Sequence, residues 1–126
     1  MTALMCLAVA IYFEARGEPV DGQFAVGEVI MNRVKSEDYP DTVCDVVFEE
    51  DQFSFTDDGK PDKLPKGTTR ESRKAFYIAG RVLMGDTMGI SSTHYHAAYV
   101  KPPWASEFPL DGRIGDHLFY TCTKEC

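Results

Sequence analysis

The fold is decided by residues 11–19, which read IYFEARGEP. Apolar residues lead into this stretch at the spacing of one helix face: Leu4, Leu7, Ala8 and Ile11. The pattern predicts a helix over residues 3–15, which Gly17 and Pro19 end because neither residue continues a helix well. A carboxylate, Glu14, therefore stands at the end of the most apolar segment of the chain.

Two more helices are expected further along the chain. One covers residues 21–35 with Asp21 as its N-cap. The other covers residues 69–84, where Thr68 and Glu71 have the spacing of a capping box. Their apolar stripes are Val26, Val29, Ile30 and Val34 in the first, and Ala75, Ile78, Ala79 and Val82 in the second.

The rest of the chain reads as loops and a small sheet. Residues 36–67 are mostly loop, interrupted by a short apolar piece at residues 43–48. Strands are expected over residues 92–100 and 116–121, where the hydrophobic period changes. Three helices followed by a small antiparallel sheet predict an α+β fold, in one domain over residues 1–126.

Composition excludes several classes of partner. The net charge of −7 argues against nucleic acid and against an anionic membrane surface. No stretch approaches the ~20 apolar residues of a membrane span. Residues 3–13 resemble the apolar part of a signal peptide, but no basic segment precedes them, and Glu14 and Arg16 occupy the place of a cleavage site. We therefore expect a monomer with no membrane span and no signal peptide in this chain.

The four cysteines allow two disulfides in three connectivities: Cys6, Cys44, Cys122 and Cys126. No CxxC pair is present, which argues against a zinc cluster. We expect Cys6–Cys44 and Cys122–Cys126, the second closing a short C-terminal loop. The alternative is four thiols, two of them core residues.

Glu14 is the first candidate for chemistry. It follows Ile11 by three residues and Leu7 by seven, so it shares the buried stripe of the first helix. Burial disfavours the charged form of a carboxylate, so we expect a raised pKa. A carboxylic acid that is still protonated near neutrality can protonate the leaving oxygen of a glycosidic bond. The alternative is an ordinary helix-end carboxylate or an ion pair with Arg16.

Four motifs follow one another in the chain: EARGE at residues 14–18, QFSF at 52–55, THYH at 93–96 and IGDHLFY at 114–120. Together with the pairs Asn32-Arg33 and Pro103-Trp104, they resemble the SleB/CwlJ-type cell wall hydrolases over about residues 6–120. The resemblance implies a lysozyme-like helical domain with a small antiparallel sheet and a cleft between the two. It implies cleavage of peptidoglycan between N-acetylmuramic acid and N-acetylglucosamine, with Glu14 as the catalytic acid and no cofactor.

The setting and the exact reaction stay open at this point. We expect action at the cell wall or in the periplasm, in phage or bacterial lysis, with release from a host cytoplasm or transport on a virion. Glycoside hydrolysis usually needs a second carboxylate, for which Glu18 is the candidate nearest in sequence and Glu28 and Asp116 are others. If none faces the cleft, Glu14 acts first as acid and then as base, and the product is a 1,6-anhydro sugar. We favour this lytic transglycosylase chemistry over hydrolysis.

Six further residues are expected to contact the substrate: Gln52, Phe53, Ser54, Tyr95, His96 and Trp104. A glutamine amide can hold an N-acetyl group, a serine hydroxyl can position a sugar, and aromatic rings offer flat faces to sugar rings. Structural alternatives exist, since Phe53 and Trp104 can equally be core residues and Gln52 a loop cap.

The histidines suggest a rival enzyme. His94 and His96 are expected on one face of a strand, with Tyr95 on the other and His117 on a neighbouring strand. Three such ligands would suit a zinc amidase or peptidase that attacks the peptides of the wall. No HExxH helix is present. We favour hydrogen-bonded histidines that support the sheet, and expect no metal.

Overall fold

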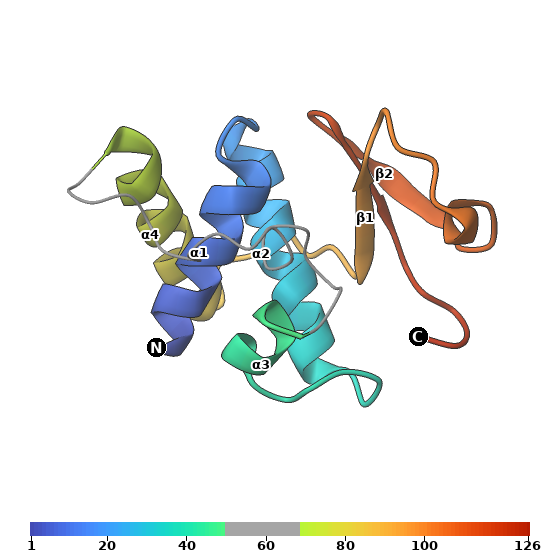
Figure 1. Ribbon diagram of the computed structural model, residues 1–126, viewed down its shortest axis with the longest axis horizontal. Helices are drawn as coiled ribbons and strands as arrows, with labels where there is room; N and C mark the ends of the chain where they lie inside the picture. The colour runs from blue at the N-terminus through green and yellow to red at the C-terminus, as the bar shows by residue number, and fades with distance from the viewer. Residues whose placement is uncertain (50–68) are drawn as a thin grey trace.

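The computed structural model describes residues 1–49 and 69–126 (Figure 1). The elements follow in the order α1 (Ala3–Ala15), α2 (Val20–Lys35), α3 (Val43–Val47), α4 (Arg70–Leu83), β1 (His94–Ala97), the 3-10 helix η2 (Pro103–Ser106), β2 (Leu110–Ile114) and β3 (His117–Tyr120). The predicted α+β class is confirmed. In the described part of the chain, no helix combines the length and the apolar character that a membrane crossing requires.

The first helix has the predicted bounds, but its burial differs from the prediction. Leu4 was expected in the core and is 38% exposed, whereas every residue from Cys6 to Tyr12 is buried. The reason is that α1 lies between α4 and α2, with α3 also packed against it (Figure 1). A helix covered on several sides has no single apolar stripe, so the spacing of its apolar residues understates its burial.

Two predicted helix caps were off by one or two residues. Asp21 lies inside α2, whose N-cap is Pro19 in an extended conformation and without a side-chain hydrogen bond. A capping box does start α4, but it joins Thr69 to Ser72 through two hydrogen bonds of 3.1 Å. Thr68 lies outside the described residues. Proline at the α2 start supplies the right backbone angle without any cap.

The sheet has the strand order β1-β3-β2 and is antiparallel throughout. The two predicted strands are present but shorter than residues 92–100 and 116–121. The edge strand β2 was missed because its sequence LDGRI shows no alternation of apolar residues, and its pairing is irregular between Leu110 and Gly112. The short helix α3 was also missed; Thr42 caps it by accepting a hydrogen bond from Asp45 N at 3.1 Å.

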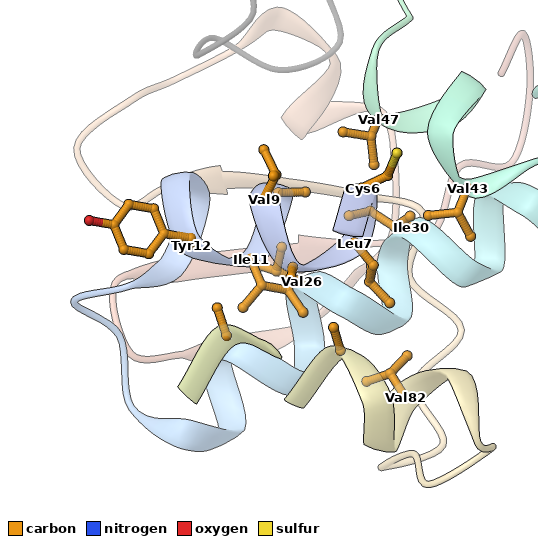
Figure 2. Close-up of a cluster of buried hydrophobic side chains, with 14 of the residues drawn as sticks. Cys6, Leu7, Val9, Ile11, Tyr12, Val26, Ile30, Val43, Val47 and Val82 are labelled. Atoms are coloured by element: carbon orange, nitrogen blue, oxygen red, sulfur yellow. The ribbon is translucent and has the colours of Figure 1, made fainter. Parts of the chain in front are cut away.

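The main core lies among the four helices (Figure 2). Its largest fully buried side chains include Leu7 and Ile11 of α1, Ile30 of α2 and Ile78 of α4. The Cys6–Cys44 disulfide joins α1 to α3, and the Cys122–Cys126 disulfide closes the C-terminal loop. The predicted pairing of the cysteines is confirmed.

The sheet is attached to the helices mainly through polar side chains of α2. The buried carboxylate of Glu28 accepts hydrogen bonds from three successive N–H groups, at residues 88–90, over 2.9 to 3.3 Å. Asn32 and Arg33 donate three more to carbonyl oxygens within residues 90–93, over 2.8 to 3.0 Å. We call Glu28, Asn32 and Arg33 the polar clasp. A small apolar cluster beside it contains Ala25, Val29 and Phe119.

A second attachment lies at the corner between α1 and α2. The Glu18 carboxylate accepts a hydrogen bond of 2.8 Å from Asp116 N in the turn between β2 and β3. Gly115 in this turn has φ +57°, and a side chain there would meet the Glu18 carboxylate and lie 2.8 Å from Pro19 Cδ. Only glycine fits this close approach, so the turn is held directly against the end of α1.

Candidate active site

Glu14 occupies the last turn of α1 and points toward the sheet. Its Oε1 accepts a hydrogen bond of 2.6 Å from the hydroxyl of Tyr95 in β1. Within residues 1–49 and 69–126, no donor is bonded to the second carboxylate oxygen, Oε2. The alternative ion pair with Arg16 is not formed, and Arg16 Nη1 instead donates to Tyr12 Oη at 2.9 Å. Among the described residues, Glu14 is thus held by the single hydrogen bond from Tyr95.

The surroundings of Glu14 favour its protonated form. Burial raises the pKa of Glu14, and the hydrogen bond from Tyr95 and the positive charge of Arg33 each offset part of that rise. Burial also raises the pKa of Tyr95 well above its usual value, so its hydroxyl stays a neutral donor. The predicted direction of the Glu14 shift is confirmed, and a carboxyl group of this kind can deliver a proton near neutral pH.

Arg33 places a positive charge behind this pair. It is 5% exposed, its Nε donates to Thr93 O at 2.8 Å, and its guanidinium carbon lies 5.1 Å from the centre of the Tyr39 ring. Burial lowers the pKa of Arg33, yet a guanidinium keeps its charge at neutral pH. Sequence reasoning gave Arg33 no role; its only signal was its place in the Asn32-Arg33 pair.

Two of the candidate second carboxylates, Glu18 and Glu28, accept hydrogen bonds from backbone N–H groups. Glu18 bonds to Asp116 N, and its Oε1 lies 3.9 Å from His117 Nδ1. Burial lowers the pKa of His117, which opposes a full ion pair there. Glu28 is fully occupied by the polar clasp. The role of Glu18 as a second acid therefore stays a prediction, with its carboxylate committed to the sheet turn.

The predicted substrate residues separate into three groups. Tyr95 lies against Glu14, as described above. His96 and Trp104 lie on the opposite face of the sheet, where their rings are 5.6 Å apart and His96 Nε2 is 2.9 Å from Tyr120 Oη. The remaining three lie outside the described residues: Gln52, Phe53 and Ser54. The structure therefore joins Tyr95 to Glu14 but does not bring His96 or Trp104 to it.

The three histidines do not converge. His94 and His96 alternate with Tyr95 along β1, so they face away from Glu14, while the His117 ring lies 5.0 Å from Tyr95 on the inner face. Burial, with the charge of Arg33, lowers the pKa of His94 to about 4. Among residues 1–49 and 69–126, no group of three His, Cys, Asp or Glu side chains is placed to hold a metal ion. The three histidines therefore do not point toward one position at which they could bind the same metal ion.

The fold combines a helical half with a small sheet and places a half-buried carboxyl group between them. Comparison with known proteins identifies the family that has this arrangement. The sequence model described as Cell Wall Hydrolase matches residues 17–120, and the chain belongs to this family. The match begins three residues after Glu14, so the assignment of that residue rests on the geometry.

Curated relatives and solved structures agree with the family. The chain is 34% identical over 113 residues to a spore cortex-lytic enzyme of Bacillus subtilis, and 34% identical over 116 residues to one of Oceanobacillus iheyensis. These matches cover 90% and 92% of the chain but 35% and 40% of the relatives, so the chain spans well under half of their length.

Two solved structures share the fold. The catalytic domain of the germination-specific lytic transglycosylase SleB from Bacillus anthracis superimposes with a TM-score of 0.76 at 32% identity, covering 94% of this chain and 93% of that one. The catalytic domain of Bacillus cereus SleB gives the same TM-score and identity, with 94% and 89% covered. The predicted lysozyme-like arrangement of helices and sheet is thus shared with a known catalytic domain.

Proposed function

We propose that the chain cleaves peptidoglycan between N-acetylmuramic acid and N-acetylglucosamine as a lytic transglycosylase. The observation that carries the proposal is the Glu14 carboxyl group, whose pKa is raised by burial and whose Oε1 accepts a hydrogen bond from Tyr95. Family membership and the likeness to SleB catalytic domains give the substrate class. A role in phage or bacterial lysis at the cell wall is part of the same proposal.

One acid suffices for this reaction. Glu14 protonates the glycosidic oxygen, so that the bond from C1 of N-acetylmuramic acid breaks and N-acetylglucosamine leaves with a free hydroxyl. The resulting Glu14 carboxylate takes the proton of the muramic 6-hydroxyl as that oxygen bonds to C1. The product carries a 1,6-anhydro ring, and Glu14 is protonated again. No water is consumed and no cofactor is required.

Two contacts support this cycle. The carboxylate formed in the first step is stabilised by the Tyr95 hydroxyl and by the charge of Arg33, which lower the pKa of Glu14 relative to burial alone. Glu18 and Glu28, the nearest alternatives in sequence to a second acid, are bonded to backbone N–H groups. A hydrolase that uses Glu18 remains the competing outcome.

The test is mass spectrometry of soluble products from purified peptidoglycan, with wild type and Glu14→Gln side by side. Anhydro-muropeptides from wild type alone are expected, with at least a roughly 100-fold loss in the variant. Hydrated reducing ends that disappear in Glu18→Gln would replace the transglycosylase with a hydrolase. Free peptides, or an active Glu14→Gln enzyme, would refute the glycosidase itself.

Tyr95→Phe gives a finer test of the acid. Removing the hydroxyl takes away a hydrogen bond that favours the charged form, so the pKa of Glu14 should rise further. The alkaline limit of activity should then move to higher pH, while the rate near the optimum falls. An unchanged pH profile would mean that this hydrogen bond does not tune the reacting group.

A further inference from the structure

We propose that a pocket on the outer face of the sheet binds a neutral N-acetylhexosamine unit of the glycan, away from the bond that Glu14 cleaves. Its volume is about 260 Å³, and its lining residues are Trp104, Glu107, Phe108, Lys124 and Glu125. We call it the tryptophan pocket. The inference rests on the proposed function for the source of the sugar.

The tryptophan pocket is separated from Glu14 by the sheet. Trp104 packs against His94 and His96, at ring distances of 5.0 and 5.6 Å, and both histidines point to the face opposite Tyr95. In Figure 1 the orange 3-10 helix that carries Trp104 lies on the side of the sheet away from the helices. A sugar bound there is not the sugar that receives the proton of Glu14.

The aromatic wall of the pocket is fixed in place before any ligand binds. Trp104 lies edge-on to Tyr120 at 5.2 Å and nearly parallel to Phe108 at 5.8 Å. Tyr120 is in turn stacked on His96 and within hydrogen-bond distance of its Nε2, at 2.9 Å. Because these rings hold one another, little side-chain ordering is needed when a ligand binds, which favours affinity.

The opposite wall is closed covalently. The Cys122–Cys126 disulfide ties the ends of the loop that carries Lys124 and Glu125. Glu125 has φ +57°, a left-handed conformation that residues other than glycine rarely adopt. Such conformations persist only where the surroundings impose them, and here the closed loop does so. The loop thus presents its charged residues in a set arrangement beside the aromatic wall.

The chemistry of the walls selects the ligand. A half-buried indole offers an apolar face to the C–H face of a sugar ring, and carboxylates accept hydrogen bonds from hydroxyl and amide N–H groups. Two carboxylates, Glu107 and Glu125, outnumber the single ammonium of Lys124, so the pocket repels the anionic lactyl and peptide groups of muramic acid. A volume below the roughly 300 Å³ of drug-sized sites suits one neutral sugar unit.

The chain carries its own reporter for this site, because Trp104 is its single tryptophan. Tryptophan emission of the Glu14→Gln protein is titrated with the trimer of N-acetylglucosamine, triacetylchitotriose. A saturable change is expected. The double variant Glu107→Gln/Glu125→Gln should bind about tenfold more weakly, the loss expected from weakening two hydrogen bonds to charged groups. Replacing the exposed Glu37 by glutamine is the matched control and should change nothing.

Each outcome decides for or against the pocket. No change of emission in the folded protein, up to the solubility limit of the trimer, overturns the inference. Equal affinity of the double variant and the Glu37→Gln control also overturns it, since the sugar would then bind elsewhere. If the trimer binds but the wild-type protein does not cleave peptidoglycan, the pocket is supported and the proposed function is refuted. Cleavage of peptidoglycan without a change of emission removes the pocket alone.

Discussion

The helical half and the sheet half of this domain are held together by different kinds of interaction. Among α1–α4, fully buried apolar side chains make the contacts, as in the pairing of α1 with α4. Between α2 and residues 88–93, the polar clasp makes six hydrogen bonds, beside a small apolar cluster around Ala25, Val29 and Phe119. Apolar packing tolerates small shifts, whereas hydrogen bonds to backbone groups fix distances and directions.

This difference matters where the two halves meet, because the Glu14–Tyr95 contact depends on their relative position. Glu14 belongs to the helical half and Tyr95 to the sheet half, and their 2.6 Å hydrogen bond joins the two. Burying a carboxylate such as Glu28 is costly unless it is hydrogen-bonded, so an arrangement that supplies its three N–H donors is favoured over one that does not. We infer that the clasp sets the position of β1 relative to Glu14, and the following predictions test the contrast between the halves.

The largest effect is expected from the disulfide of the helical half. Removing Cys6–Cys44 by a double serine substitution frees a loop of 38 residues, whereas removing Cys122–Cys126 frees one of 4. The chain-entropy relation gives losses of about 4 and about 2 kcal/mol in the free energy of unfolding. Urea denaturation of both variants measures this difference. Equal losses would contradict the chain-entropy account.

Next comes a cavity in the apolar core. Leu7→Ala should cost about 3 kcal/mol, since Leu7 is fully buried among the helices. The urea unfolding transition can be followed by far-UV circular dichroism, which reports on the helices, and by Trp104 fluorescence, which reports on the sheet half. In Leu7→Ala both transitions should move to lower urea by the same amount. Leu4→Ala, in the same helix at a position 38% exposed, is the control and should cost under about 1 kcal/mol.

The polar clasp should respond differently. Glu28→Gln weakens the acceptor of three backbone N–H groups and should cost about 2 kcal/mol. We expect the fluorescence transition to move to lower urea than the circular dichroism transition, because the sheet detaches first. The exposed Glu71→Gln serves as the matched control. Coincident transitions in Glu28→Gln would show that the halves do not separate.

The smallest effect is a dependence of stability on pH at the boundary. The pKa of Glu14 is raised in the folded chain, so its contribution to stability is complete below the unfolded pKa and is lost as pH rises through the folded pKa. Glu14→Gln should therefore be more stable than wild type at pH 7, with a higher melting temperature. The gain in the free energy of unfolding should be under about 1 kcal/mol, because water still reaches this half-buried group. This gain should vanish below pH 4. Thermal melts of both proteins, with Glu37→Gln as control, measure it; a gain at every pH would exclude ionisation as its cause.

The sequence predicted what depends on periodicity and local chemistry. The bounds of α1, the presence of α2 and α4 and the rise in the pKa of Glu14 all followed from spacing and burial. The expected cysteine pairing, one of three connectivities, is the one observed. Helix starts were misplaced by a residue or two, since Thr69 and Thr68 are equally good caps in sequence. The strand β2 was hidden because a half-exposed edge strand with a central glycine has no apolar alternation.

The site was harder to predict for a physical reason. Glu28, Asn32 and Arg33 look like surface residues of an amphipathic helix, yet in the fold Glu28 and Arg33 are buried and Asn32 is half-buried beneath residues 88–93. Their partners are backbone groups 58 to 62 residues away, which carry no side-chain signature. In the same way, strand alternation put Tyr95 and His96 on different faces, but it could not say which face would meet Glu14.

The polar clasp also has a consequence for the order in which the chain is made. Among the described elements, α1–α4 end at Leu83, so the residues of the helical half are synthesised before those of β1. At that stage the clasp residues have no strand to hold and Glu14 has no Tyr95. Glu14 therefore gains its hydrogen bond from Tyr95 only after β1 has been synthesised and has paired with β3. A chain halted before residue 94 lacks the hydroxyl group that holds Glu14.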